Sequence, residues 1–130
     1  MTIVLVDTSA LAKTVIGEPE SPAVATWLDE SSSTRTLVVS SLAVAELRRL
    51  AISWDLPHEL VNKALQGVNI VPMTEPILHH SGVLPHRQLR TLDAIHLATA
   101  IAIEARTMMT YDDRLAEAAT AEGLLVVSPR

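Results

Sequence analysis

Short apolar segments alternate with longer amphipathic ones along the chain. The apolar runs have the length and composition of β-strands covered on both faces: Ile3–Val6, Leu37–Val39, Val68–Met73, Thr107–Thr110 and Leu124–Val127. Between these runs the apolar positions have helical spacing, and the helical segments begin near residues that favour helix starts. Strands alternating with helices favour right-handed crossovers. We therefore expect an α/β fold in which a central, mainly parallel sheet of about five strands is sandwiched between helices.

Length and composition predict one domain spanning residues 1–130. Hydrophobic residues make up 48% of the chain and charged residues 19%, which favours a well-filled core. There is no cysteine, so disulfides, thiol catalysis and zinc ribbons are excluded. Met1–Asp7 lacks the basic start of a signal peptide, and the longest apolar stretch, Ala94–Ile103, is too short to span a membrane. We expect a cytoplasmic protein with no membrane partner.

The charge and aromatic content argue against a general nucleic-acid-binding surface. The net charge is −5, so a uniformly basic, phosphate-binding surface is not expected. Only Trp27, Trp54 and Tyr111 are aromatic, too few for a platform on which several bases stack. The positions of the acidic residues are therefore more informative than their number.

Four carboxylates interrupt strongly apolar segments, namely IVLVD, LAVAEL, LDAIHLA and TMMTYD. They are Asp7, Glu46, Asp93 and Asp112. Asp7 and Asp112 follow two expected strands, whose carboxyl ends lie at one edge of a parallel sheet. Asp93 and Glu46 lie near the starts of helices that follow crossovers toward the same edge. The pattern predicts that all four converge there.

Converging carboxylates raise one another's pKa unless a cation compensates them. Ligands that are all oxygen suit Mg²⁺ or Mn²⁺, and such sites typically catalyse phosphoryl transfer. Neighbouring residues can support this chemistry. Thr8, Ser9 and Thr110 offer hydroxyls, Asp113 is a second acid beside Asp112, and Arg87 and Arg90 are candidates for phosphate contacts.

Each acidic residue also has a purely structural interpretation. Asp7, Asp93 and either Asp112 or Asp113 can be helix N-caps. Glu46 has no capping role, but it can be a solvated residue on a polar stripe with Arg49. His96 can reach the site, although a hydrogen-bonded place in the core or behind the site is the commoner role for such a residue.

With these residues assembled, the sequence resembles PIN-domain ribonucleases, specifically the VapC-type toxins of type II toxin–antitoxin systems. The segments that carry the resemblance are VDTSAL, AELR, LDAIHLATA and TYDDRL, spread over the whole chain. The resemblance implies that Asp7, Glu46, Asp93 and Asp112 are the family's metal-binding catalytic acids and that Thr110 is its hydroxyl before the last acid. It also implies a parallel α/β/α sandwich, Mg²⁺- or Mn²⁺-dependent endoribonuclease activity on RNA, a homodimer, and inhibition by a cognate VapB-type antitoxin.

Other functions fit less well. The four glycines are isolated, so dinucleotide and P-loop motifs are absent, as is the GxSxG motif of serine hydrolases. The alternative that stays open is a catalytically inactive PIN-like module that binds RNA or protein. A degenerate copy of the domain has no need to retain four costly carboxylates, which favours the enzyme.

Overall fold

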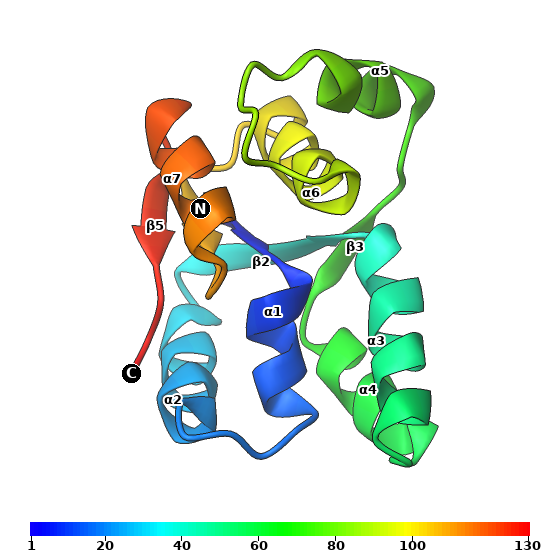
Figure 1. The fold of residues 1–130 in the computed structure, drawn as a ribbon. Coiled ribbons are helices and arrows are strands. Elements are labelled where there is room, and N and C mark those ends of the chain that lie inside the picture. The colour runs from blue at the N-terminus through cyan, green and yellow to red at the C-terminus, as the bar shows by residue number, and fades with distance from the viewer.

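The computed structural model describes residues 1–130 and contains one five-stranded sheet in which every pair of strands is parallel (Figure 1). The strands are β1 (Thr2–Val6), β2 (Arg35–Ser40), β3 (Asn69–Val71), β4 (Thr107–Met109) and β5 (Leu125–Val127). Their order across the sheet is β3-β2-β1-β4-β5, so β1 is central. The predicted fold class is confirmed.

Helices cover both faces of the sheet. They are α1 (Thr8–Leu11), α2 (Ser21–Ser31), α3 (Leu42–Ser53), α4 (His58–Gln66), α5 (Glu75–Val83), α6 (Thr91–Ala102) and α7 (Asp113–Ala121), with the 3₁₀ turn η1 (Ala12–Thr14) after α1. The first four helices lie on one side of the sheet and the last three on the other (Figure 1). No helix has the length and apolarity that crossing a bilayer requires.

The core consists of two apolar clusters, one on each face of the sheet. Val4 and Val6 of β1 belong to the cluster under α1, α2, α3 and α4, whereas Leu5 belongs to the cluster under α6 and α7. This alternation follows the period of two along a strand. A strand buried on both faces must be apolar at every position, which explains why β1 reads as a continuous apolar run.

The start of α6 corrects one of the structural interpretations of the acidic residues. The apolar pattern predicts a helix from Ala94, with Asp93 as a possible N-cap. In the structure Arg90 is the N-cap, in an extended conformation, and the backbone N–H of Ala94 already donates to the Arg90 carbonyl. Asp93 therefore lies within the first helical turn, and its side chain does not cap the helix.

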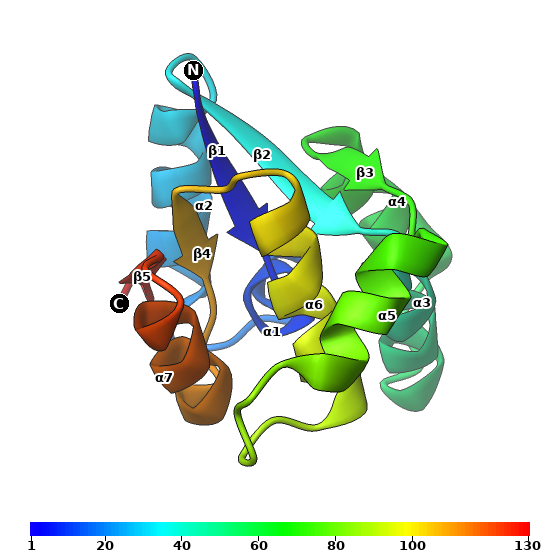
Figure 2. The ribbon, with the colours of Figure 1, turned by 90° about the horizontal axis from the view of Figure 1, so that it is seen from above.

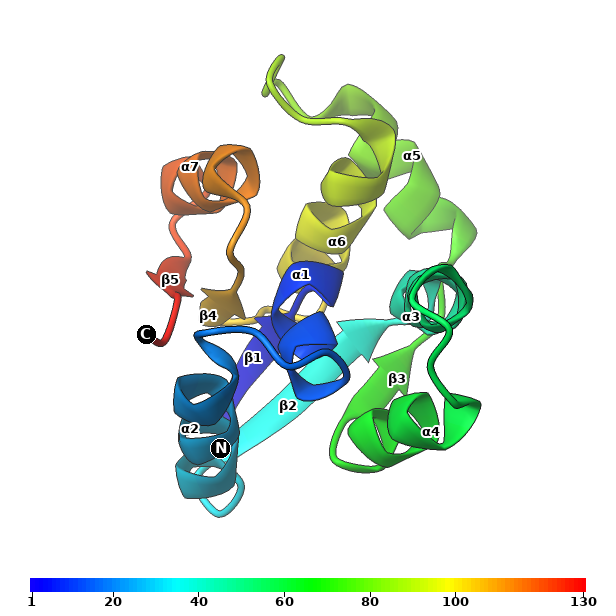
Figure 3. The same cartoon turned by 60° about the horizontal axis from the view of Figure 1, so that its bottom comes forward.

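The carboxyl ends of the strands and the starts of three helices meet at one edge of the sheet. Helices α1 and α7 follow β1 and β4 directly, and α6 begins near the same edge (Figure 2). Figure 3 shows the same edge from another side, with α6 lying between α7 and α5. In open parallel sheets this edge is the usual position of a functional site.

Candidate active site

A pocket of about 870 Å³ opens at this edge of the sheet. Its lining is rich in charged residues and comes from α3, the start of α6 and the segment from β4 into α7. The lining residues are Glu46, Arg90, Thr91, Leu92, Asp93, Tyr111, Asp112, Asp113 and Arg114. The structure thus brings three of the four predicted acids into one cavity.

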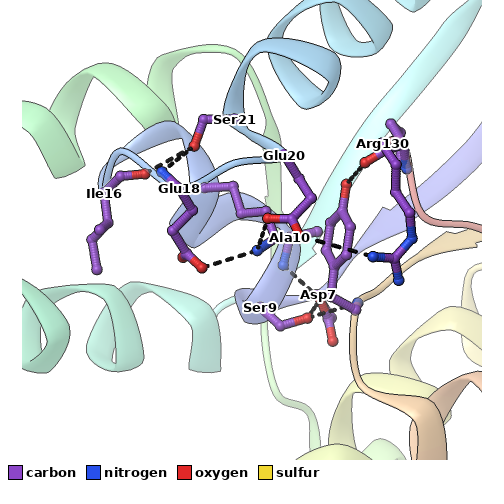
Figure 4. A network of polar contacts seen from close by, with 11 residues as sticks. Asp7, Ser9, Ala10, Ile16, Glu18, Glu20, Ser21 and Arg130 are labelled. Carbon is purple, nitrogen blue, oxygen red and sulfur yellow. Dashed lines mark hydrogen bonds and ion pairs between the residues drawn. The ribbon is translucent and has the colours of Figure 1, made fainter.

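Asp7, the fourth acid, is buried beside this pocket and is 3% exposed. Its Oδ1 accepts hydrogen bonds from Ser9 Oγ at 2.7 Å and from the Ala10 backbone N–H at 3.0 Å (Figure 4). Its Oδ2 accepts from Thr110 Oγ1 at 2.6 Å. Burial raises the pKa of Asp7 above its usual value, although these three donors oppose the shift. Asp7 is therefore both the N-cap of α1 and a costly buried acid.

The predicted hydroxyl residues join the β1–α1 turn to the β4–α7 segment. Ser9 Oγ accepts the backbone N–H of Tyr111 at 3.0 Å, and Thr110 Oγ1 accepts that of Asp112 at 3.0 Å. Both hydroxyls also donate to Asp7. Ser9 and Thr110 therefore couple the position of Asp7 to that of Asp112.

Glu46 lies in the second turn of α3 and is held by two donors. Thr8 Oγ1 donates to Glu46 Oε1 at 2.6 Å, and Nε2 of His96 lies 2.8 Å from the same oxygen. Burial by itself would raise the pKa of Glu46, but the hydrogen bonds from His96 and Thr8 bring the pKa below its usual value. These hydrogen bonds favour the ionised form of Glu46, and they hold its Oε1 between α1 and α6.

His96 occupies the hydrogen-bonded position expected of it, behind the pocket. The residue is 2% exposed, and its Nδ1 has no hydrogen-bond partner. A buried nitrogen without a partner is uncommon in folded proteins. The orientation of the ring is thus set by its contact with Glu46.

Asp93 is the acid on which the charges of the others act. Burial is the main cause that raises its pKa, and the nearby charges of Asp112, Asp7 and Glu46 raise it further, while His96 lowers it. No hydrogen bond is formed by its side chain. The other three predicted acids therefore lie close enough to Asp93 for their charges to raise its pKa.

Asp112 is the N-cap of α7, and Asp113 is the first residue of that helix. The Asp112 Oδ1 accepts the backbone N–H of Leu115 at 2.9 Å, which leaves its Oδ2 free. Asp113 is exposed at the pocket wall. Capping and exposure to the pocket are thus compatible for Asp112.

The oxygen atoms present suit a hydrated divalent cation. Both oxygens of Asp93, Oε2 of Glu46 and Oδ2 of Asp112 have no hydrogen-bond partner, and all three residues line the pocket. No three His, Asp or Glu side chains are placed to ligate one ion together. Mg²⁺ usually retains several waters and binds only one or two carboxylates. The donor set therefore fits such an ion, without forming a closed protein cage.

Of the two arginines expected to contact phosphate, only Arg90 lines the pocket. Arg87 is exposed in the preceding loop, outside the pocket lining. Arg114, a basic residue that the sequence offers for phosphate contact but favours less than Arg87 and Arg90, also lines it. Its place two residues after Asp112, in the first turn of a helix that follows a strand, is the signal for this position.

A buried cation supports the pocket wall from behind. Lys13 is 8% exposed, and its Nζ lies 3.1 Å from both Glu18 and Glu20. The same ammonium lies 4.5 Å from the centre of the Tyr111 ring. Figure 4 shows Glu18, Glu20 and Arg130 of this network.

The segment after β5 also holds the part of the pocket wall formed by residues 110–112. Ser128 Oγ donates to the Thr110 carbonyl at 2.6 Å, and the Tyr111 hydroxyl donates to the Pro129 carbonyl. The backbone N–H of Thr110 donates to the Val127 carbonyl at 3.2 Å. Residues 110–112 are therefore fixed from several directions.

The chain is similar to known proteins over nearly its whole length. The family model described as PIN domain matches residues 4–121. Ribonuclease VapC47 of Mycobacterium tuberculosis is 36% identical over 132 residues, covering 98% of this chain and 97% of the relative. Ribonuclease VapC46 of the same species is 35% identical, covering 99% of both.

Solved structures share the fold. VapBC2 from Rickettsia felis, bound to a DNA fragment from its promoter, superposes with a TM-score of 0.81 at 16% identity, covering 99% of this chain and 100% of that one. A toxin–antitoxin complex from Klebsiella pneumoniae gives a TM-score of 0.75 at 24% identity, covering 98% of each chain. With the family model matched over most of its length and relatives above 30% identity over nearly all of it, the chain belongs to the PIN domain family.

Proposed function

We propose that this protein is a metal-dependent endoribonuclease, the VapC-type toxin of a toxin–antitoxin pair. The observation that carries the proposal is the gathering of Glu46, Asp93 and Asp112 in one pocket, with Asp7 near enough to raise the pKa of Asp93. The curated relatives, which match nearly the whole chain, are named ribonucleases, and this supports the proposal.

Hydrogen bonds within the chain orient the acidic side chains at the pocket. Hydrogen bonds with Thr8 and His96 lower the pKa of Glu46, and Asp7 is oriented by Ser9 and Thr110. Asp93 and Asp112 have carboxylate oxygens without a hydrogen-bond partner, which are free to coordinate a cation. Mg²⁺ or Mn²⁺ bound there would activate a water and stabilise the departing oxygen of a phosphodiester.

We propose a cognate VapB-type antitoxin and a second copy of the chain as partners. Solved structures of related fold are toxin–antitoxin complexes, which supports the first partner. Leu78 and Val83, two large exposed apolar side chains that line one hollow on α5, support the second. Light scattering after size exclusion tests the dimer, because a mass near 14.0 kDa would indicate a monomer.

Replacement of Asp93 tests the catalytic proposal. Asp93 forms no hydrogen bond, so Asp93→Asn removes the charge while disturbing few contacts. We expect the Mg²⁺-dependent cleavage of RNA to fall at least about 100-fold, the order of loss that removal of a strong catalytic contact causes. Cleavage is measured on total cellular RNA with end mapping, with and without EDTA.

Glu117→Gln is the matched control. Glu117 is an exposed acid on α7 that does not line the pocket, so this variant should cleave like the parent. Cleavage by Asp93→Asn at the parent rate would contradict the proposal. A parent that binds RNA but never cleaves it would favour the inactive binding module instead.

A further inference from the structure

The eight arginines of the chain divide into two groups by their contacts. Three have partners: Arg35 bonds Ser31, Arg48 bonds Asn62 and the His58 carbonyl, and Arg130 pairs with Glu20. Five form neither an ion pair nor a side-chain hydrogen bond, namely Arg49, Arg87, Arg90, Arg106 and Arg114. Only two of these five line the acidic pocket, Arg90 and Arg114.

These two arginines share the pocket with four carboxylates and pair with none of them. All six ion pairs of the structure lie elsewhere. An arginine that forms a bidentate pair with a carboxylate has used its donors, whereas Arg90 and Arg114 retain theirs for a planar or tetrahedral anion. The pocket therefore contains two guanidinium groups that form no ion pair within the protein.

The two arginines enter the pocket lining from different helices. Arg90 is the N-cap of α6, three residues before Asp93, and Arg114 is the second residue of α7, two residues after Asp112. Helices α6 and α7 contact each other. Each of the two helix starts therefore contributes at least one acid and one arginine to the pocket, so a polyanion that reaches from one helix start to the other can meet both guanidinium groups.

The pocket offers no free aromatic ring for base stacking. Tyr111 is its one aromatic residue, and Lys13 and Arg130 lie over the Tyr111 ring, 4.5 and 5.8 Å from its centre. The Tyr111 hydroxyl is bonded to the Pro129 carbonyl. The ring is therefore committed to packing within the protein.

We propose that Arg90 and Arg114 hold the RNA phosphates on the two sides of the bond to be cleaved, so that this pocket recognises the sugar–phosphate backbone and not the bases. This inference rests on the proposed function. It replaces the expected pair of Arg87 and Arg90 with a pair drawn from two helices.

Binding of single-stranded RNA at several salt concentrations tests the inference. The probes are fluorescein-labelled 12-nucleotide oligouridine and oligoadenosine, and every variant carries Asp7→Asn so that the probe stays intact. Arg90→Gln and Arg114→Gln should each reduce the slope of log K against log salt by about 0.7, the value for one phosphate contact on a single strand. Each should also weaken binding of both probes, roughly threefold to fivefold at low salt.

Arg106→Gln is the matched control, because Arg106 is exposed and without a partner but precedes β4, away from the pocket. It should bind with the slope of the parent. Arg90 forms no side-chain cap and Arg114 no side-chain bond, so thermal unfolding should be unchanged in both pocket variants. In the chain with Asp7 intact, the same two substitutions should raise KM and leave kcat nearly unchanged, as expected for uniform binding.

An unchanged slope for either pocket variant, or an equal loss in Arg106→Gln, would overturn the inference. So would a loss confined to one of the two probes, because this would indicate base recognition. If the parent cleaves RNA while the arginine variants bind normally, the proposed function stands and the phosphate contacts are wrong. If the parent neither binds nor cleaves RNA, both fail.

Discussion

Asp7 illustrates how a helix N-cap can also be a costly buried acid. Its Oδ1 satisfies the first turn of α1, while burial raises its pKa and makes the charged form costly. Ordinary N-caps are exposed enough to avoid this cost. The structure confirms the capping interpretation of Asp7, and its burial separates it from a simple cap and supports its proposed place in the active site.

Asp7→Asn should stabilise the metal-free protein at neutral pH, or leave its stability unchanged. A group whose pKa is raised by folding destabilises the fold when it is ionised, and the parent regains stability relative to the variant as pH falls toward the usual value of 3.8. Asparagine keeps the capping oxygen, and the Thr110 hydroxyl can turn to accept from its amide. Urea unfolding between pH 4 and 8 in EDTA measures the difference. A variant less stable than the parent at pH 7 would show that the donors outweigh burial.

His96→Leu should separate stability from activity. The change removes a buried nitrogen that has no partner, an arrangement that costs about 1–3 kcal/mol. This gain offsets the loss of the contact between His96 and Glu46, so the free energy of unfolding should change little. Glu46 loses one of its two hydrogen-bond partners and keeps Thr8, so its pKa rises, and RNA cleavage should fall about 10- to 100-fold, as for other residues that orient a metal ligand. Urea unfolding and kcat/KM measure the two effects. His96→Gln, which retains a donor, should recover part of the activity; equal loss in both variants would refute this role.

At the scale of elements, the start of α7 depends on the segment that follows β5. Tyr111 and Thr110 are bonded to residues 127–129, and Tyr111 packs against the buried Lys13. A segment distant in sequence thus determines how firmly Asp112 is held. Because catalytic groups tolerate only small displacements, this support matters for the site as well as for stability.

Tyr111→Phe should lower the free energy of unfolding by about 1 kcal/mol, the usual contribution of one hydrogen bond. The ring and its contact with Lys13 remain, so only the bond to the Pro129 carbonyl is lost. Urea unfolding measures the change. Ser128→Ala, which removes the bond to the Thr110 carbonyl, should cost a similar amount, and no loss in either variant would show that this segment does not hold the wall.

Sequence reasoning predicts these elements well where the apolar period is strong and less well at their ends. Leu5 between Val4 and Val6 shows why β1 could be recognised: both faces are buried, so no polar residue interrupts it. Helix α6 begins at Thr91, earlier than the apolar pattern predicts, because its N-cap, Arg90, is not a usual capping residue. The contact of His96 with Glu46 shows the limit for the site: spacing along the chain places His96 near Asp93 but does not encode which residue of α3 it meets.

At the scale of the whole molecule, a ligand that binds only the folded site must stabilise the fold. Mg²⁺ or Mn²⁺ at a concentration of 100 times its dissociation constant should add about 2.7 kcal/mol. For a domain of this size that corresponds to a rise in Tm of roughly 10 °C. Calorimetry with added metal, then with EDTA, measures the rise and its reversal. Asp93→Asn should show a much smaller rise, and an equal rise in parent and variant would place the ion outside the pocket.

The central place of β1 has a consequence for synthesis. Strand β1 leaves the ribosome before both strands that pair with it, β2 on one side and β4, about a hundred residues later, on the other. Asp93 and Asp112 are also translated late, and pairings between such distant segments form slowly. A nascent chain therefore carries no complete pocket until translation has passed Arg114.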